Sequence, residues 1–266
     1  MLILLILKGS PFLFTSFVFL FALLGLAEYY RMALPERKIE AALASLAGAA
    51  LPVILSNPLH STSLFLGFGA NSFASPLVVL TVLFLSGAVR ILFSVRDIRQ
   101  SAAEIALLVM GIMYVPLMLT HLVWLRALPD GIAWLFLMLV IVMSGDTAAY
   151  YVGSAIGKRK LYPVVSPNKS VEGALGGLCG SLLGTLIAKG TFFPGLSLGD
   201  CIVTALVIGM LGQVGDLFES MLKRSFGVKD SGALIPGHGG ILDRLDSILF
   251  AAPATYYYAL FVFMSR

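Results

Sequence analysis

The sequence predicts an all-α, polytopic integral membrane protein. Apolar residues make up 59% of its 266 residues and charged residues only 12%, whereas globular domains have roughly 45–50% and about 25%. The apolar residues also fall into long runs, and a helix needs about 20 of them to cross a bilayer. The sequence has no segments with the alternating pattern of barrel strands, so we expect helices to satisfy the backbone polar groups in lipid.

Eight windows have the length and composition of transmembrane helices. In chain order they are 11–30, 40–56, 76–95, 104–125, 131–156, 171–188, 199–221 and 243–264. The stretch 62–75 is apolar but interrupted by glycines and serines, so it could be a re-entrant segment or a ninth helix. We expect an N-terminal transmembrane region, 1–125, and a C-terminal region, 126–266, that carries the polar motifs.

The distribution of basic residues predicts the orientation of these helices. Of the 18 Lys and Arg residues, 14 fall on one side of the eight windows and 4 on the other. Because Lys- and Arg-rich loops stay in the cytoplasm, both termini should lie outside. The loops 31–39, 157–170 and 222–242 should then face the cytoplasm. No basic face with interleaved aromatic residues occurs, which argues against nucleic acid as a partner.

The sixth window has a glycine-rich face. Gly173, Gly176, Gly177, Gly180 and Gly184 follow one another in small-xxx-small spacings, which let helix backbones approach closely. The pattern fits packing within the chain and packing across a homodimer equally well.

Carboxylates inside membrane spans are costly and usually functional. Asp146 lies in the fifth window, about ten residues before its cytoplasmic end, a recess of ~15 Å. Asp216 and Glu219 lie near the cytoplasmic end of the seventh window, and Asp243 and Asp246 open the eighth. Such oxygen ligands suit Mg²⁺, which bridges protein carboxylates to substrate phosphates. The expected ligands of one or two cations are Asp146, Asp216, Asp243 and Asp246. The alternative is that each carboxylate, Glu172 included, only pairs with a basic residue at a helix end.

The loop between the last two windows combines basic residues with a glycine-rich turn. Glycines let backbone N–H groups approach an anion, and the helix N-terminus that follows favours negative charge. A second polar loop, 166–170, precedes the sixth window. We expect Asp216, Asp243, Asp246 and Lys223 to be catalytic. The expected substrate-binding residues are Ser220, Arg224, Lys229, Asp230, His238, Gly239, Gly240, Arg244, Asn168 and Lys169.

Three segments of that loop form one long motif: SMLKR at 220–224, KDSG at 229–232 and IPGHGGILDRLD at 235–246. This run resembles the signature of phosphatidate cytidylyltransferases (CDP-diacylglycerol synthases). The segments around Asp146 and at 166–173 are also similar to that family, whereas residues 1–125 match only as hydrophobic spans. The resemblance implies a divalent-metal-dependent transfer of CMP from CTP to phosphatidic acid at the cytoplasmic face of the cell membrane, giving CDP-diacylglycerol and pyrophosphate.

On this interpretation Lys223 and Lys229 bind phosphate. Their replacement by Gln should then lower turnover and leave stability nearly unchanged. His238 is expected either to donate to phosphate or to make a structural contact in the loop.

Two other kinds of protein share some of these features. A cation-coupled transporter would place ionisable residues near the bilayer midplane in both halves of an inverted repeat, whereas most carboxylates here gather on one side of the C-terminal half. Another CTP-using membrane lipid enzyme, such as a polyprenol kinase or an ether-lipid cytidylyltransferase, would need similar chemistry. Only the length and completeness of the motif at 220–246 disfavour it.

Overall fold

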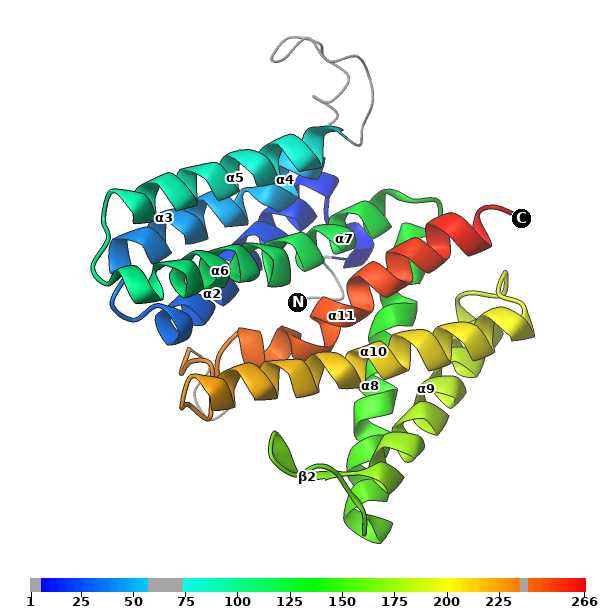
Figure 1. The fold of residues 1–266 in the computed structure, drawn as a ribbon. Helices are drawn as coiled ribbons and strands as arrows, with labels where there is room; N and C mark the ends of the chain where they lie inside the picture. The colour runs from blue at the N-terminus through cyan, green and yellow to red at the C-terminus, as the bar shows by residue number, and fades with distance from the viewer. Residues whose placement is uncertain (1–5, 57–73, 235–238) are drawn as a thin grey trace.

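The computed structural model describes residues 6–56, 74–234 and 239–266, and nearly all of its elements are helices (Figure 1). The helices are α2 (Pro11–Ala33), α3 (Lys38–Ala49), α4 (Leu51–Ser56), α5 (Ala74–Leu92), α6 (Ile98–Tyr114), α7 (Pro116–Ala127), α8 (Gly131–Ile156), α9 (Val171–Thr191), α10 (Leu198–Ser225), α11 (Leu242–Tyr258) and the π-helical turn η2 (Ala259–Phe263). Strands β1 (Lys160–Tyr162) and β2 (Ser166–Ser170) form an antiparallel hairpin between α8 and α9.

Seven helical segments within the described residues are long and apolar enough to cross a membrane. They are Pro11–Ala33, Lys38–Leu55, Ile98–Ala127, Gly131–Ile156, Val171–Thr191, Leu198–Ser225 and Leu242–Phe263. A shorter apolar helix, Val78–Leu92, stands where the third span is expected. The prediction of a polytopic helical membrane protein is thus confirmed. The stretch 62–75, considered as a ninth helix, lies outside the described residues except for Ala74 and Ser75, which begin α5.

The fourth span differs from its predicted window because it is longer and interrupted. It runs over Ile98–Ala127 and is divided into α6 and α7 at Val115 and Pro116. Proline fixes its own φ, lacks an N–H donor and disfavours the helical region for the residue before it, which accounts for the break. α7 and α11 pack together between the N-terminal helices and α8–α10 (Figure 1). The predicted regional boundary between 125 and 126 falls near the end of α7.

A buried arginine ties together the loops at one end of the molecule. Arg37, between α2 and α3, forms an ion pair of 2.7 Å with Glu104 of α6 and donates to the carbonyl of Ser94 at 2.6 Å. The hydrogen bond to Glu104 raises the pKa of Arg37 above its ordinary value, so the guanidinium stays charged. The α2–α3 loop and the α5–α6 loop are both among those that the basic-residue count places on the same side.

The opposite end has its own polar anchors. Arg126 donates to the carbonyls of Ile6 and Gly9, the second at 2.6 Å. Arg266 pairs with the buried Asp200 at 2.9 Å. The residues that the basic-residue count places on opposite sides of the membrane therefore lie at opposite ends of the molecule.

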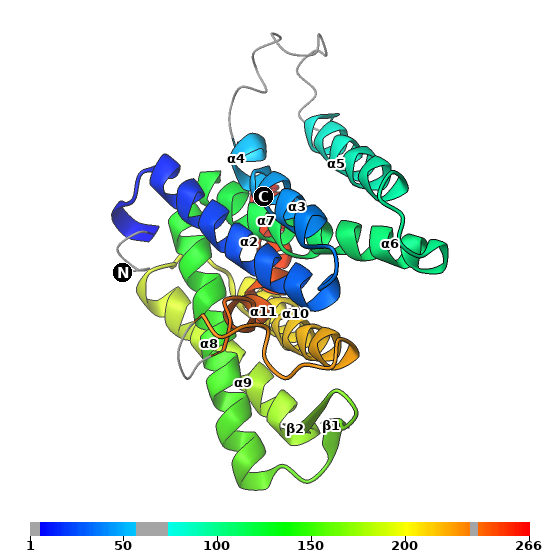
Figure 2. The same ribbon diagram turned by 90° about the vertical axis from the view of Figure 1, so that its left-hand side faces the viewer.

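The glycine face of α9 packs against α8 of the same chain. A Cβ atom on Gly180 would lie 2.4 Å from Cβ of Ala148 and 2.7 Å from the carbonyl oxygen of Ser144. A Cβ atom on Gly176 would lie 2.6 Å from the side chain of Val152. Figure 2 shows the two helices running side by side as far as the hairpin. Close packing within the chain accounts for the glycine pattern, and a homodimer stays a separate prediction.

We therefore expect Gly180→Ala to destabilise the protein by about 1–3 kcal/mol, the usual cost of overpacking a well-packed contact. Gly190→Ala is a matched control on the same helix, because no atom lies within 4 Å of the added Cβ. Thermal unfolding in detergent should show a lower midpoint for the first variant and an unchanged or higher one for the second. Equal midpoints would contradict this packing.

Candidate functional site

A polar cavity of about 690 Å³ lies beside the β1–β2 hairpin, among α8, α9, α10 and α11. It gathers residues that are distant in sequence. The predicted site residues that line it are Asp146, Asn168, Lys169, Asp216, Asp243, Arg244 and Asp246. The structure thus brings together the three regions that the sequence singled out: the fifth span, the 166–170 loop and the last two spans.

The hairpin positions Lys169 over the cavity. Glu172, at the start of α9, accepts hydrogen bonds from the backbone N–H groups of Lys158 at 3.0 Å and Arg159 at 3.1 Å. Glu172 therefore has a structural role, which it fulfils by accepting hydrogen bonds from backbone N–H groups. Lys169 reaches across to α10 and forms an ion pair of 2.6 Å with Asp216.

Four carboxylates from three helices line this cavity, and three of them, Asp146, Asp216 and Asp246, form a group. Asp146 of α8 and Asp246 of α11 both lie close enough to Asp216 for their charges to interact. Among the described residues, two basic side chains, Lys169 and Arg244, line the same space. The walls therefore carry more negative than positive charge, which suits a bound cation.

These residues fit magnesium only if the substrate supplies part of its coordination. Within the described residues, no three Asp, Glu, His or Cys side chains form a ready-made metal site. Magnesium usually keeps several waters and takes one or two protein carboxylates together with substrate phosphates. Asp146, Asp216 and Asp246 offer that hard-oxygen donor set.

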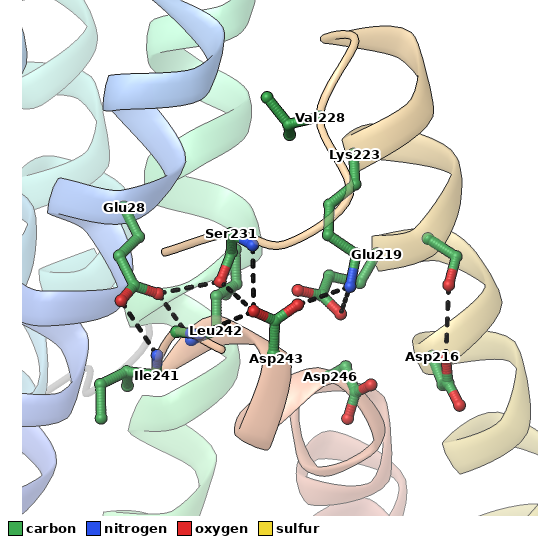
Figure 3. A network of polar contacts seen from close by, with 12 residues as sticks. Glu28, Asp216, Glu219, Lys223, Val228, Ser231, Ile241, Leu242, Asp243 and Asp246 are labelled. Carbon is green, nitrogen blue, oxygen red and sulfur yellow. Dashed lines mark hydrogen bonds and ion pairs between the residues drawn. The ribbon is translucent and has the colours of Figure 1, made fainter. Parts of the chain in front are cut away.

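Asp243, also expected as a metal ligand, is instead committed to the loop between α10 and α11. One of its oxygens accepts from Lys223 Nζ at 2.5 Å. The other accepts from Ser231 N at 3.0 Å and Gly240 N at 2.8 Å, and it lies 2.9 Å from Ser231 Oγ, whose one proton it shares with Glu28 (Figure 3). A carboxylate has about four acceptor positions, and these donors occupy most of them. The geometry therefore does not support a metal-ligand role for Asp243.

Lys223 is held by two carboxylates and does not line the cavity. Its Nζ lies 3.1 Å from Glu219 and 2.5 Å from Asp243. The side chain of Glu219 is fully buried, and its second oxygen has no hydrogen-bond partner among the described residues. Replacing Lys223 would leave that carboxylate unpaired, so from this geometry we expect a loss of stability in place of the nearly unchanged stability expected from the sequence.

The other predicted residues that the structure describes lie near the loop and are not among the residues that line the cavity. Ser220 Oγ is 3.5 Å from Asp216, a long contact for a hydrogen bond. Arg224 donates to the carbonyl of Val228 at 3.2 Å, while Lys229 and Asp230 are exposed. Gly239 has φ +81°, and a Cβ there would lie 2.6 Å from Asp243. Gly240 contributes its backbone N–H, and His238 falls outside the described residues.

Sequence reasoning missed two residues. Gln213 lines the cavity and donates to the carbonyl of Ala174 at 3.1 Å, joining α10 to α9. Glu28 contacts the loop between α10 and α11. It is the only charged residue in the window 11–30, and the cost of a carboxylate in lipid was the signal that could have identified it.

The profile of the Cytidylyltransferase family matches residues 1–262. This chain belongs to the cytidylyltransferase family. The chain is also similar to proteins named phosphatidate cytidylyltransferase in three bacteria. The chain is 43% identical to the Staphylococcus saprophyticus protein over 155 residues, 58% of this chain and 59% of that one. It is 41% identical to the Bacillus subtilis protein over 156 residues, 58% of each chain. It is 46% identical to the Staphylococcus aureus protein over 126 residues, 47% of this chain and 48% of that one.

These alignments each span less than two thirds of the curated relatives' length. The family match covers nearly the whole chain, so cytidylyltransferase membership also extends to the N-terminal helices. From the sequence, these resembled the family only as hydrophobic spans.

Proposed function

We propose that this chain is a phosphatidate cytidylyltransferase, which transfers CMP from CTP to phosphatidic acid and releases pyrophosphate. The observation that carries the proposal is the cavity that combines Asp146, Asp216 and Asp246 with Lys169 and Arg244. It lies among membrane-spanning helices, so a lipid and a charged nucleotide can meet there. The names of the relatives point to the same substrate.

In the proposed reaction, a phosphate oxygen of phosphatidic acid attacks the α-phosphorus of CTP. The bond between the α-phosphorus and the oxygen bridging to the β-phosphate breaks, and pyrophosphate leaves with that oxygen. A phosphate monoester has its second pKa at about 6, so the nucleophile is already largely ionised near neutral pH. The chain therefore needs no strong general base, and its task is to bring two anions together.

The basic residues of the cavity serve that task. Arg244 suits two-point contacts with phosphate oxygens, and the ammonium group of Lys169 pairs with Asp216 at 2.6 Å in this structure. Magnesium held by Asp146, Asp216 and Asp246 would offset the charge of the phosphates and activate the α-phosphoryl group. Lys223 and Asp243 hold the neighbouring loop in place.

The test is an assay with purified protein, CTP labelled in the cytosine ring, phosphatidic acid and Mg²⁺. A lipid-soluble cytidine product that needs phosphatidic acid supports the proposal. A polyprenol kinase would leave the label in water and transfer phosphate to a polyprenol instead. A transporter would give neither lipid product, and either of these two results would overturn the assignment.

We also propose that the cavity faces the cytoplasm. The split of 14 to 4 basic residues supports this orientation, as does the gathering of the loops at two ends of the molecule. In a background without Cys179 and Cys201, a Val164→Cys variant at the exposed hairpin tip should resist a membrane-impermeant maleimide in intact bacteria and react after permeabilisation. A Gly190→Cys variant, at the other end, should react in intact cells. The reverse pattern would rule out this orientation.

A further inference from the structure

The loop between α10 and α11 is anchored to α2 by a buried carboxylate. Glu28 is only 5% exposed. Its Oε1 accepts from the N–H of Ile241 at 3.0 Å, and its Oε2 accepts from the N–H of Leu242 at 2.9 Å (Figure 3). Ser231 Oγ lies 3.0 Å from the same Oε2. One side chain therefore meets three donors that come from both described parts of the loop, 226–234 and 239–241, and from the start of α11.

Glu28 acts as the missing cap of α11. The first N–H groups of a helix have no partner within the helix and need one from elsewhere. Ile241, at the N-cap position, makes no capping hydrogen bond with its own side chain. Glu28, 213 residues earlier in the chain, accepts from Ile241 and from the first helical residue, Leu242. A negative charge is also favoured at this end of a helix.

Two glycines of the motif make room for this carboxylate. A Cβ atom on Gly240 would lie 2.3 Å from Glu28 Oε2, and one on Gly232 would lie 2.5 Å from Oε1. Both distances are far below van der Waals contact, and both glycines lie beside a buried, fixed group. The close approach of the loop to α2 thus explains these two positions.

The contact continues from Glu28 to the cavity. Ser231 Oγ lies between Glu28 at 3.0 Å and Asp243 Oδ2 at 2.9 Å, and Asp243 in turn holds Lys223. The same end of α11 carries Arg244 and Asp246 on the cavity wall. Any shift of Ile241 and Leu242 would therefore move the residues that face the substrate.

We infer that Glu28 is a positioning residue for the transfer reaction. It fixes the α10–α11 loop and the N-terminus of α11, so that Arg244 and Asp246 keep their places in the cavity. The N-terminal helices are then part of the catalytic apparatus as well as a membrane anchor. This inference rests on the proposed function for its kinetic readout, but its structural readout is independent of that function.

The test compares Glu28→Gln with the wild-type protein. Gln has the same size, but its NH₂ group must face at least one of the three donors. We expect kcat/KM for CTP to fall at least about tenfold, a difference of roughly 1.4 kcal/mol. Hydrogen exchange of the amides at 240–243 should rise while exchange in α8 and α9 stays the same. Glu104→Gln is the matched control, since Glu104 is a largely buried carboxylate of the N-terminal helices that pairs with Arg37.

A second variant, Ser231→Ala, tests whether Glu28 acts through Ser231, because it removes only the hydroxyl that Glu28 and Asp243 share. In the double variant Glu28→Gln, Ser231→Ala, the loss of kcat/KM should be smaller than the product of the two single losses, as expected for groups in one network. If Glu28→Gln does not fold, Ser231→Ala carries the same exchange and kinetic test.

The inference is overturned if Glu28→Gln keeps wild-type kcat/KM and wild-type exchange at 240–243, or if Glu104→Gln loses activity equally. A wild-type protein that forms no lipid-soluble cytidine refutes the proposed function instead. The exchange measurement would still decide whether Glu28 holds the loop.

Discussion

An Asp246→Asn variant should lose cytidylyl transfer activity by about two orders of magnitude or more and keep its thermal stability. The activity should fall because a charged ligand is removed. Metal charge stabilisation supplies several kcal/mol, and each 1.36 kcal/mol is tenfold in rate. The fold should tolerate the change because Asp246 lies among the like charges of Asp216 and Asp146, so neutralising it relieves repulsion.

Turnover measured against Mg²⁺ and Mn²⁺ concentration, together with unfolding midpoints in detergent, checks this prediction. Excess metal should rescue part of the lost activity if Asp246 is a ligand. Asp243→Asn gives the contrast: it should lose stability as well as activity, because Lys223, Ser231 and Gly240 all depend on that carboxylate. An Asp246→Asn protein with near-normal turnover would end the metal assignment for this residue.

A Lys223→Gln variant should be strongly destabilised, by about 3–5 kcal/mol, the usual effect of removing one partner of a buried ion pair. The loss arises because Glu219 is fully buried and Lys223 is the cation bonded to it. Turnover should fall too, since Asp243 loses one of its four donors.

The double variant Glu219→Gln, Lys223→Gln separates the two effects. It removes the uncompensated charge, so the unfolding midpoint should recover most of its loss, while turnover per folded molecule should stay low because Asp243 still lacks its ammonium partner. A Lys223→Gln protein with a wild-type midpoint would show that the ion pair contributes little to the fold. That result would restore the simple phosphate-binding role expected from the sequence.

Hydropathy predicted the helices, because it depends on local composition. The basic-residue count also predicts on which side of the membrane each loop lies, and that orientation stays a prediction. The cavity was also predictable in part. Asp146, Asp216 and Asp246 were identified because carboxylates are costly in lipid, and Lys169 and Arg244 because they lie in polar segments beside spans.

The partners of these residues depend on tertiary contacts that no local pattern records. Asp243 and Asp246 stand one helical turn apart at the start of α11, and both were expected to be catalytic metal ligands. Both line the cavity, but only the fold shows that Asp243 is bonded to Lys223 and Ser231. Glu28 was likewise overlooked, because its partners lie 203 to 214 residues further along the chain.

The bond between α2 and α11 also bears on how the protein is made. During translation α2 enters the membrane long before α11 has been synthesised. The nascent chain therefore carries the carboxylate of Glu28 before its three hydrogen-bond donors have been made. During that interval the carboxylate must stay near the headgroups, because a charged group in the bilayer core is costly. This stage ends when α11 is inserted and packs against α2. Chains whose synthesis stops before that point should be preferred substrates of membrane proteases.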